Sequence, residues 1–109
     1  MILTLDEVLG EIEVDRADLT AWIEQRWVLP ARQDEALLFD AADVARVRLI
    51  CELRRDMMVN EEAMPVVLSL LDQVYGLRRT LDELRAAITA ASAEARAEIA
   101  ARLGRPPED

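Results

Sequence analysis

The sequence predicts a mainly α-helical fold with one short β-hairpin and a long C-terminal helix, and three observations predict it. Apolar residues make up 52% of the 109 residues but aromatic residues only 4%, so the core must be built mainly from Leu, Val, Ala and Ile. Gly and Pro number only 3 and 4, which leaves little material for the many turns of an all-β fold. Apolar residues also recur at helical spacing between capping residues.

The first two helices are predicted from their start signals. Thr4 and Glu7 have the spacing of a capping box, which predicts a short helix over residues 5–10. Asp15 is expected to cap a second helix over residues 16–26. Apolar spacing gives this second helix one shared face, which carries Leu19, Trp22, Ile23 and Arg26. We expect Trp22 to pack in the core.

Two short arms around a polar tip predict a β-hairpin, or wing, after the second helix. Residues 28–32 form the first arm, because the residue before a proline favours extended backbone. Residues 33–35 form the tip and residues 37–39 the second arm. Asp40 is expected to cap a third helix over residues 41–57. The apolar positions of this third helix are Val44, Val47, Ile50, Cys51 and Leu53.

The last helix is predicted to be the longest, over residues 61–103, with Asn60 as its cap. Its apolar positions alternate in steps of four and three, as in a coiled-coil seam. The seam consists of Leu70, Val74, Leu77, Leu81, Leu84, Ile88, Ala91 and Ala95. Because the sequence offers no second antiparallel helix to cover this stripe, we expect a homodimer. The alternative is that only the first half packs, on residues 1–57, while the rest frays.

This reading divides the chain into a winged-helix domain at residues 1–58, a dimerisation helix at residues 59–103 and a disordered tail at residues 104–109. The longest apolar run, residues 64–71, is far shorter than the ~20 residues of a membrane span. The start of the chain lacks the basic region of a secretion signal, so we expect a cytoplasmic location. The single Cys51 is expected to be a buried apolar residue.

The residue inventory disfavours catalysis and metal binding. The chain has no His, which excludes His-based zinc sites and Ser-His or Cys-His catalysis. Paired acids such as Asp82-Glu83 are read as surface charges, because no nucleophile or base is gathered with them. We therefore expect no enzyme activity, no cofactor and no metal, and no motif indicates a small-molecule ligand.

The charge distribution disfavours DNA as a partner. The net charge is -9, with seven acids and two bases in residues 1–30, six and five in residues 31–59, and nine and six in residues 60–109. A net-negative protein is repelled by phosphate backbones unless its bases cluster, and no segment here is basic. The acidic excess indicates either a solvated surface or a face that recruits a basic protein.

The order of the predicted elements is similar to the MerR-like winged helix-turn-helix with a C-terminal dimerisation helix. Within it, residues 27–32 (WVLPAR), residues 53–56 (LRRD) with Val59, and residues 65–77 (PVVLSLLDQVYGL) resemble the CbpM family of chaperone modulators. The resemblance covers about residues 3–88. It implies a protein that binds the J-domain of a CbpA-type, DnaJ-like co-chaperone and inhibits its stimulation of the Hsp70 chaperone DnaK. The alternatives are a MerR-like DNA-binding transcriptional regulator and a structural or antitoxin-like adaptor with another partner.

Departures from the DNA-binding members point toward protein binding. Their second helix usually carries an Arg-Tyr-Tyr type run and their wing is basic, whereas residues 20–23 are Thr-Ala-Trp-Ile and residues 33–35 are Gln-Asp-Glu here. If the same face meets a protein instead, the candidate partner-binding residues are Asp15, Asp18, Glu24, Trp27 and Asp34. In this hypothesis Trp27 is an exposed apolar anchor. The seam residues assigned to dimerisation are Leu70, Val74, Leu77, Leu81, Leu84 and Ile88.

Two other faces remain open as partner-binding surfaces. One is the acidic face of the first helix, with Asp6, Glu7 and Glu11. The other is the last helix, through Asp72 and Tyr75.

Overall fold

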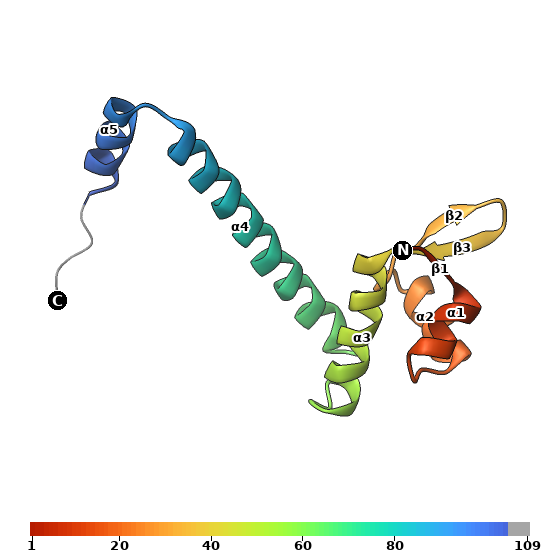
Figure 1. Ribbon diagram of the computed structural model, residues 1–109. Helices are drawn as coiled ribbons and strands as arrows, with labels where there is room; N and C mark the ends of the chain where they lie inside the picture. Colours follow the sequence, from red (N-terminus) through yellow and green to blue (C-terminus); the bar gives the residue numbers. More distant parts are fainter. Residues whose placement is uncertain (105–109) are drawn as a thin grey trace. The chain divides into compact units, whose positions relative to one another are not determined.

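The computed structural model describes residues 1–104, and in these residues the fold is mainly helical with a small sheet (Figure 1). The strands are β1 (Leu3–Thr4), β2 (Ala31–Gln33) and β3 (Ala36–Phe39). The helices are α1 (Leu5–Glu11), α2 (Arg16–Glu24), α3 (Ala41–Arg55), α4 (Met64–Ala90) and α5 (Ala93–Leu103). The chain divides into two compact units, Met1–Leu68 and Ser69–Asp109. The predicted winged helix-turn-helix with a long C-terminal helix is therefore confirmed as the fold class.

The predicted wing is present as the hairpin β2–β3, but its first arm is shorter than predicted, because residues 28–30 lie outside β2 and Gln33 belongs to the strand and not to the tip. Its antiparallel register pairs Gln33 with Ala36, so the turn is the dipeptide Asp34-Glu35. Asp34 has a φ of 52°, a left-handed conformation that Asp adopts more readily than most residues. β1 completes an antiparallel sheet of order β1-β3-β2 by pairing Leu3 with Phe39. No sequence pattern predicted β1, because two residues are too few to show strand alternation.

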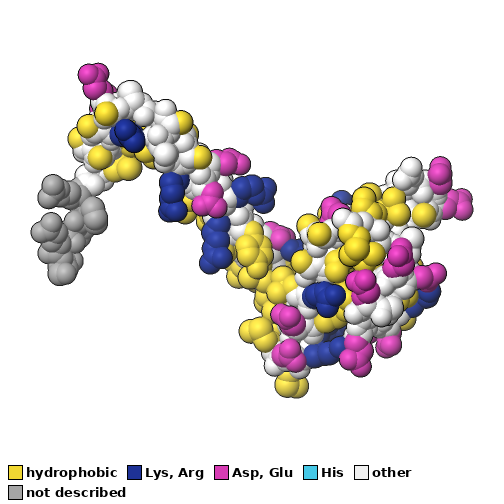
Figure 2. Space-filling view, viewed as in Figure 1, with side chains coloured by type: hydrophobic (Ala, Val, Ile, Leu, Met, Phe, Trp, Pro, Cys, Tyr) yellow, Lys and Arg dark blue, Asp and Glu magenta, His cyan; other side chains and the backbone are white. Residues whose placement is uncertain are grey.

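The core of the first unit joins the helices to this sheet. Its fully buried side chains come from separate elements and include Val8, Leu19, Val28, Phe39, Val47, Ile50 and Met64. Burying a side chain such as Phe39 stabilises the fold by roughly 1.5–3 kcal/mol. Among the described residues no polar or charged side chain is buried, so the charges lie on the surface. Figure 2 shows carboxylates spread over the visible face of this unit, with Arg side chains among them.

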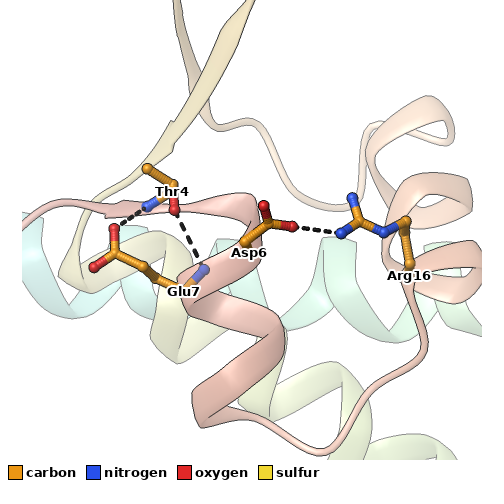
Figure 3. A network of polar contacts seen from close by, with 4 residues as sticks. All are labelled: Thr4, Asp6, Glu7 and Arg16. Carbon is orange, nitrogen blue, oxygen red and sulfur yellow. Dashed lines mark hydrogen bonds and ion pairs between the residues drawn. The ribbon is translucent and has the colours of Figure 1, made fainter.

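Capping side chains set the starts of α1 and α3. The Thr4 hydroxyl accepts from the Glu7 backbone N–H at 3.3 Å, and the Glu7 carboxylate accepts from the Thr4 N–H at 3.0 Å (Figure 3). Asp40 and Asp43 form the same reciprocal pair before α3, at 2.8 and 3.0 Å. Both predicted caps are confirmed. Asp15 precedes α2 as predicted, but its side chain makes no cap hydrogen bond.

Two predicted helix ends lie two residues too far along the chain. α2 ends at Glu24, because Arg26 has a φ of 66° and leaves the helix, so Arg26 does not share the face of Leu19 and Trp22. α3 ends at Arg55 rather than at residue 57, and Met58 follows with a φ of 54°. After both helices the chain turns through a non-glycine residue at positive φ. The usual glycine that marks a helix end is therefore missing from the sequence at both places.

The last helix is not continuous, which corrects the prediction of a single helix over residues 61–103. The Asn60 side chain accepts from the Ala63 N–H at 2.8 Å, but α4 begins only at Met64. The chain leaves the helix after Ala90, and the Ser92 hydroxyl accepts from the Ala95 N–H at 3.2 Å to start α5. A Ser side chain competes for backbone N–H groups in this way, while the surrounding alanines keep the helical pattern.

The break shortens the predicted seam. Ala91 lies in the break and Ala95 belongs to α5, so the part of the seam on α4 ends at Ile88. Gly104, with a φ of 71°, follows Leu103 and confirms the predicted end of the helical region. Residues 105–109, most of the tail that we expected to be disordered, lie outside the described residues.

Candidate functional site

The outward face of α2 carries almost no hydrogen-bond donors. Leu19 and Trp22 are buried, with 0% and 4% of their surface exposed, so they turn the opposite side of the helix to solvent. The exposed side chains of that side are Ala17, Thr20, Ala21 and Glu24. Two methyl groups, one hydroxyl and one carboxylate give this face no positive charge and little capacity to read a base edge.

Three arginines on or near α2 lie beside carboxylates. Arg16 donates to Asp6 on α1 in a contact drawn in Figure 3. Arg54 of α3 lies 3.9 Å from the Asp18 carboxylate, measured from Nη1 to Oδ1. Arg55 lies 3.9 Å from the Glu13 carboxylate, measured from Nη1 to Oε2. These carboxylates lower the positive potential that a phosphate backbone would meet at the three guanidinium groups, although of the three only Arg16 donates a hydrogen bond to its carboxylate.

The acidic candidates from the sequence lie on the surface but do not form one cluster. Asp15, Glu24 and Asp34 are exposed, and Asp18 is half-buried beside Arg54. Asp15 precedes α2 and Glu24 is its last residue, so they lie about 13.5 Å apart along the helix axis at 1.5 Å per residue. Asp34 lies in the turn of the wing. The acidic surface therefore runs along α2 and reappears at the hairpin, as a dispersed charge.

Trp27 is not an exposed anchor, which corrects the expectation from the sequence. Only 9% of its surface is exposed. The backbone N–H of Trp27 donates to the Trp22 carbonyl at 2.9 Å, and the Trp27 backbone carbonyl accepts from Arg46 Nε at 2.9 Å. Trp27 therefore fastens the end of α2 to α3 and belongs to the core. The left-handed Arg26 immediately before it turns the chain inward, and the sequence carried no glycine to indicate this turn.

A pocket between α2 and α3 is the feature that sequence reasoning missed. It has a volume of about 180 Å³ and is lined by Val14, Asp18, Trp22, Cys51, Arg54 and Arg55. The Arg54 guanidinium lies over the Trp22 ring, 5.8 Å from its centroid. The spacing of residues 51, 54 and 55 places them on one face of α3, and residues 18 and 22 share a face of α2. That signal was present, but nothing in the sequence said that the two faces would meet.

The Cys51 thiol in this pocket is buried, as predicted. Burial raises its pKa above the ordinary value, and the positive charges of Arg55 and Arg54 only partly oppose that effect. The thiol is therefore protonated and weakly nucleophilic at neutral pH. Elsewhere, burial also raises the pKa of Asp43 in the α3 capping box.

In the second unit, α4 carries an exposed apolar stripe. Between 42% and 65% of the surface is exposed at each of Leu70, Val74, Leu77, Leu81 and Leu84, while Ile88 is half-buried. These residues repeat in steps of four and three and so lie along one side of the helix. The two other candidates on this helix, Asp72 and Tyr75, are exposed, Tyr75 by 48% of its surface. Such a stripe is typical of a helix that packs against another helix.

No group of three His, Cys, Asp or Glu side chains in residues 1–104 is placed to hold a metal ion. None of the helices in that part has the length and apolar character required to cross a membrane.

The chain matches a known protein family. A family model described as "MerR HTH family regulatory protein" matches residues 3–86, which include every strand, α1 to α3 and most of α4. No curated protein and no solved structure matches the chain.

Proposed function

Starting from the finding that this chain belongs to the MerR HTH family of regulatory proteins, we propose that it is a chaperone modulator rather than a DNA-reading member. In this proposal it binds the J-domain of a CbpA-type, DnaJ-like co-chaperone and inhibits its stimulation of the Hsp70 chaperone DnaK. The support comes from the surface of α2 and the wing together with the resemblance of three sequence stretches to the CbpM family.

The observation that carries the proposal is the composition of the outward face of α2. A recognition helix in the major groove needs donors for base edges and basic neighbours for phosphates. This face instead presents Ala17, Thr20, Ala21 and Glu24. The wing turn adds Asp34 and Glu35, and Arg32 is the single base on β2.

An acidic surface suits a J-domain, because the resemblance implies a partner that is strongly basic along the helix that meets Hsp70. Complementary charges accelerate the diffusional encounter of two proteins. Asp15, Glu24 and Asp34 are exposed and able to contribute to this attraction. Asp18 contributes less, since it already lies beside Arg54.

The exposed stripe of α4 supports a homodimer as part of the same proposal. Leu70, Leu77 and Leu84 alternate with Val74 and Leu81, which is the pattern of a two-helix seam. Pairing with the same stripe of a second copy removes these side chains from water. The homodimer would then contain the acidic winged-helix domains of both copies.

The direct test is a titration of the purified chain with its cognate J-domain, followed by calorimetry at low and at physiological salt. We expect a complex whose affinity falls as salt rises, because the attraction is electrostatic. In a parallel assay, the chain should reduce J-domain stimulation of DnaK ATP hydrolysis without changing the basal rate. Absence of a complex at low ionic strength contradicts the proposal.

The second candidate function is sequence-specific DNA binding, which membership of the MerR HTH family favours. A gel-shift assay with DNA upstream of the chain's own gene distinguishes the two. Site-selective, salt-sensitive binding to a duplex favours this candidate over the first.

A further inference from the structure

We propose that the pocket between α2 and α3 binds a small organic carboxylate through Arg54 and Arg55. The pocket lies in the first unit and has a volume of about 180 Å³. A single water molecule takes up about 30 Å³ in the liquid, so the space suits a ligand of several heavy atoms. The sequence contained no motif for such a ligand.

Charge is the first argument for a carboxylate. The whole chain is acidic, with 22 acids against 13 bases. The pocket lining departs from this balance, because it holds two guanidinium groups and one carboxylate, that of Asp18, while the Glu13 carboxylate lies outside the lining, 3.9 Å from Arg55. A surface that is negative in general but positive at one concave place selects for an anion there.

Unused hydrogen-bonding capacity is the second argument. A guanidinium has five N–H donors in a planar fork that fits a carboxylate. The nearest carboxylate oxygens, on Asp18 and Glu13, lie 3.9 Å from Arg54 and Arg55, which is beyond hydrogen-bond length. Arg55 donates a hydrogen bond from Nη2 to the Glu13 backbone carbonyl. The other N–H donors of Arg55 are left for a ligand.

Orientation is the third argument. The Arg54 guanidinium is held over the Trp22 ring, 5.8 Å from the centroid, and its side chain is only 33% exposed. Arg55 is held by the Glu13 carbonyl across the same pocket. Both forks are thus positioned before a ligand arrives, and a preorganised site loses less side-chain entropy on binding. The Glu13 side chain is 96% exposed and can move aside.

The test uses succinate as the probe and succinamide, its neutral counterpart, as the control. The full-length chain is titrated at constant ionic strength and followed by the amide and indole signals in two-dimensional NMR. We expect saturable shifts at Trp22, Cys51 and the end of α3 with succinate and none with succinamide. Equal shifts with both compounds, or no saturable shift with succinate, overturn the proposal.

Matched variants identify the groups responsible. Arg54→Lys keeps the charge but loses the planar fork, and Arg55→Gln loses the charge; each should weaken succinate binding at least tenfold. Arg78→Gln, an exposed position on α4 outside the pocket, should leave the affinity unchanged. If all three variants fold and bind succinate as the unmodified chain does, the two arginines do not form the site. The readout involves neither a J-domain nor DNA, so its failure leaves the proposed function untouched.

Discussion

The guanidinium of Arg54 lies 5.8 Å from the centroid of the Trp22 ring and so joins the last turn of α3 to the last turn of α2. Trp22 is almost fully buried, and Arg54 covers the edge at which the two helices meet. Asp18, one turn before Trp22, lies 3.9 Å from the same guanidinium. One side chain therefore connects the two faces that build the pocket.

Loss of this contact should destabilise the first unit. We expect Arg54→Ala to lower the free energy of unfolding by about 1 kcal/mol, the magnitude of a partly exposed cation–π contact. Arg54→Lys should retain part of it, because the ammonium can still lie over the ring. Chemical denaturation measures both, with Arg48→Ala as the control. A loss in the control as large as that in Arg54→Ala would show that the contact itself contributes nothing.

The capping box before α3 makes a second stability prediction. Asp40→Ala removes the acceptor of the Asp43 N–H, bonded at 2.8 Å, and should cost about 1 kcal/mol. Asp40→Asn keeps an acceptor oxygen in the same place and should lose less. Thermal unfolding followed by circular dichroism ranks the three chains. Equal stability of Asp40→Ala and Asp40→Asn would contradict the role assigned to this cap.

The proposed dimer is tested at the centre of the α4 stripe. Leu81→Asp places a charge in the seam and should reduce the mass measured by light scattering from that of a dimer to that of a monomer. Arg79→Asp introduces the same side chain about 200° around the helix and should leave the mass unchanged. An unmodified chain that is monomeric at all concentrations, or a Leu81→Asp chain that stays dimeric, argues against this seam.

The surface of α2 and the wing should control how fast a basic partner arrives. We expect Glu24→Gln combined with Asp34→Asn to lower the association rate with the J-domain several-fold at low salt, because attraction between the two surfaces is reduced. Asn is chosen at position 34 since it also tolerates the left-handed backbone there. Glu62→Gln with Glu83→Gln removes the same charge outside α2 and the wing and serves as the control. Equal rates in the two double variants, measured by stopped flow, would move the binding surface elsewhere.

Burial of the Cys51 thiol predicts both slow labelling and a pH dependence. Because burial raises the pKa of this thiol, the folded chain holds its proton to higher pH than the unfolded chain. The contribution of the protonated thiol to the free energy of unfolding is therefore fully present below the ordinary thiol pKa of about 8.5. It falls as the pH rises from there through the raised pKa of the folded chain. Urea unfolding between about pH 8 and pH 9.5 should show this fall, with Cys51→Ala as the control that lacks it.

Thiol labelling gives an independent check on the same residue. At neutral pH a thiol reagent should react with Cys51 in the folded chain far more slowly than in denaturant. Equal rates in the folded and unfolded chains would mean that the thiol is open to solvent.

Local rules in the sequence determined most elements of the first unit. Thr4 with Glu7 and Asp40 with Asp43 are bonded between residues three apart, so a short window of sequence contained both partners. The wing was likewise predictable, because its two arms flank a polar tip. The heptad spacing on α4 was visible for the same reason, and the pairing of that helix remains a prediction.

What the tertiary structure decided depends on residues far apart in the chain or on single backbone angles. Trp27 was taken for an exposed anchor, but the turn at Arg26 carries it into the core against Arg46, nineteen residues away. The break at Ser92 depends on one hydroxyl competing for a backbone N–H within an alanine-rich pattern. The pocket exists because the face of Asp18 and Trp22 meets the face of Cys51, Arg54 and Arg55. Periodicity assigns side chains to a face of one helix, but only packing decides which other face lies opposite.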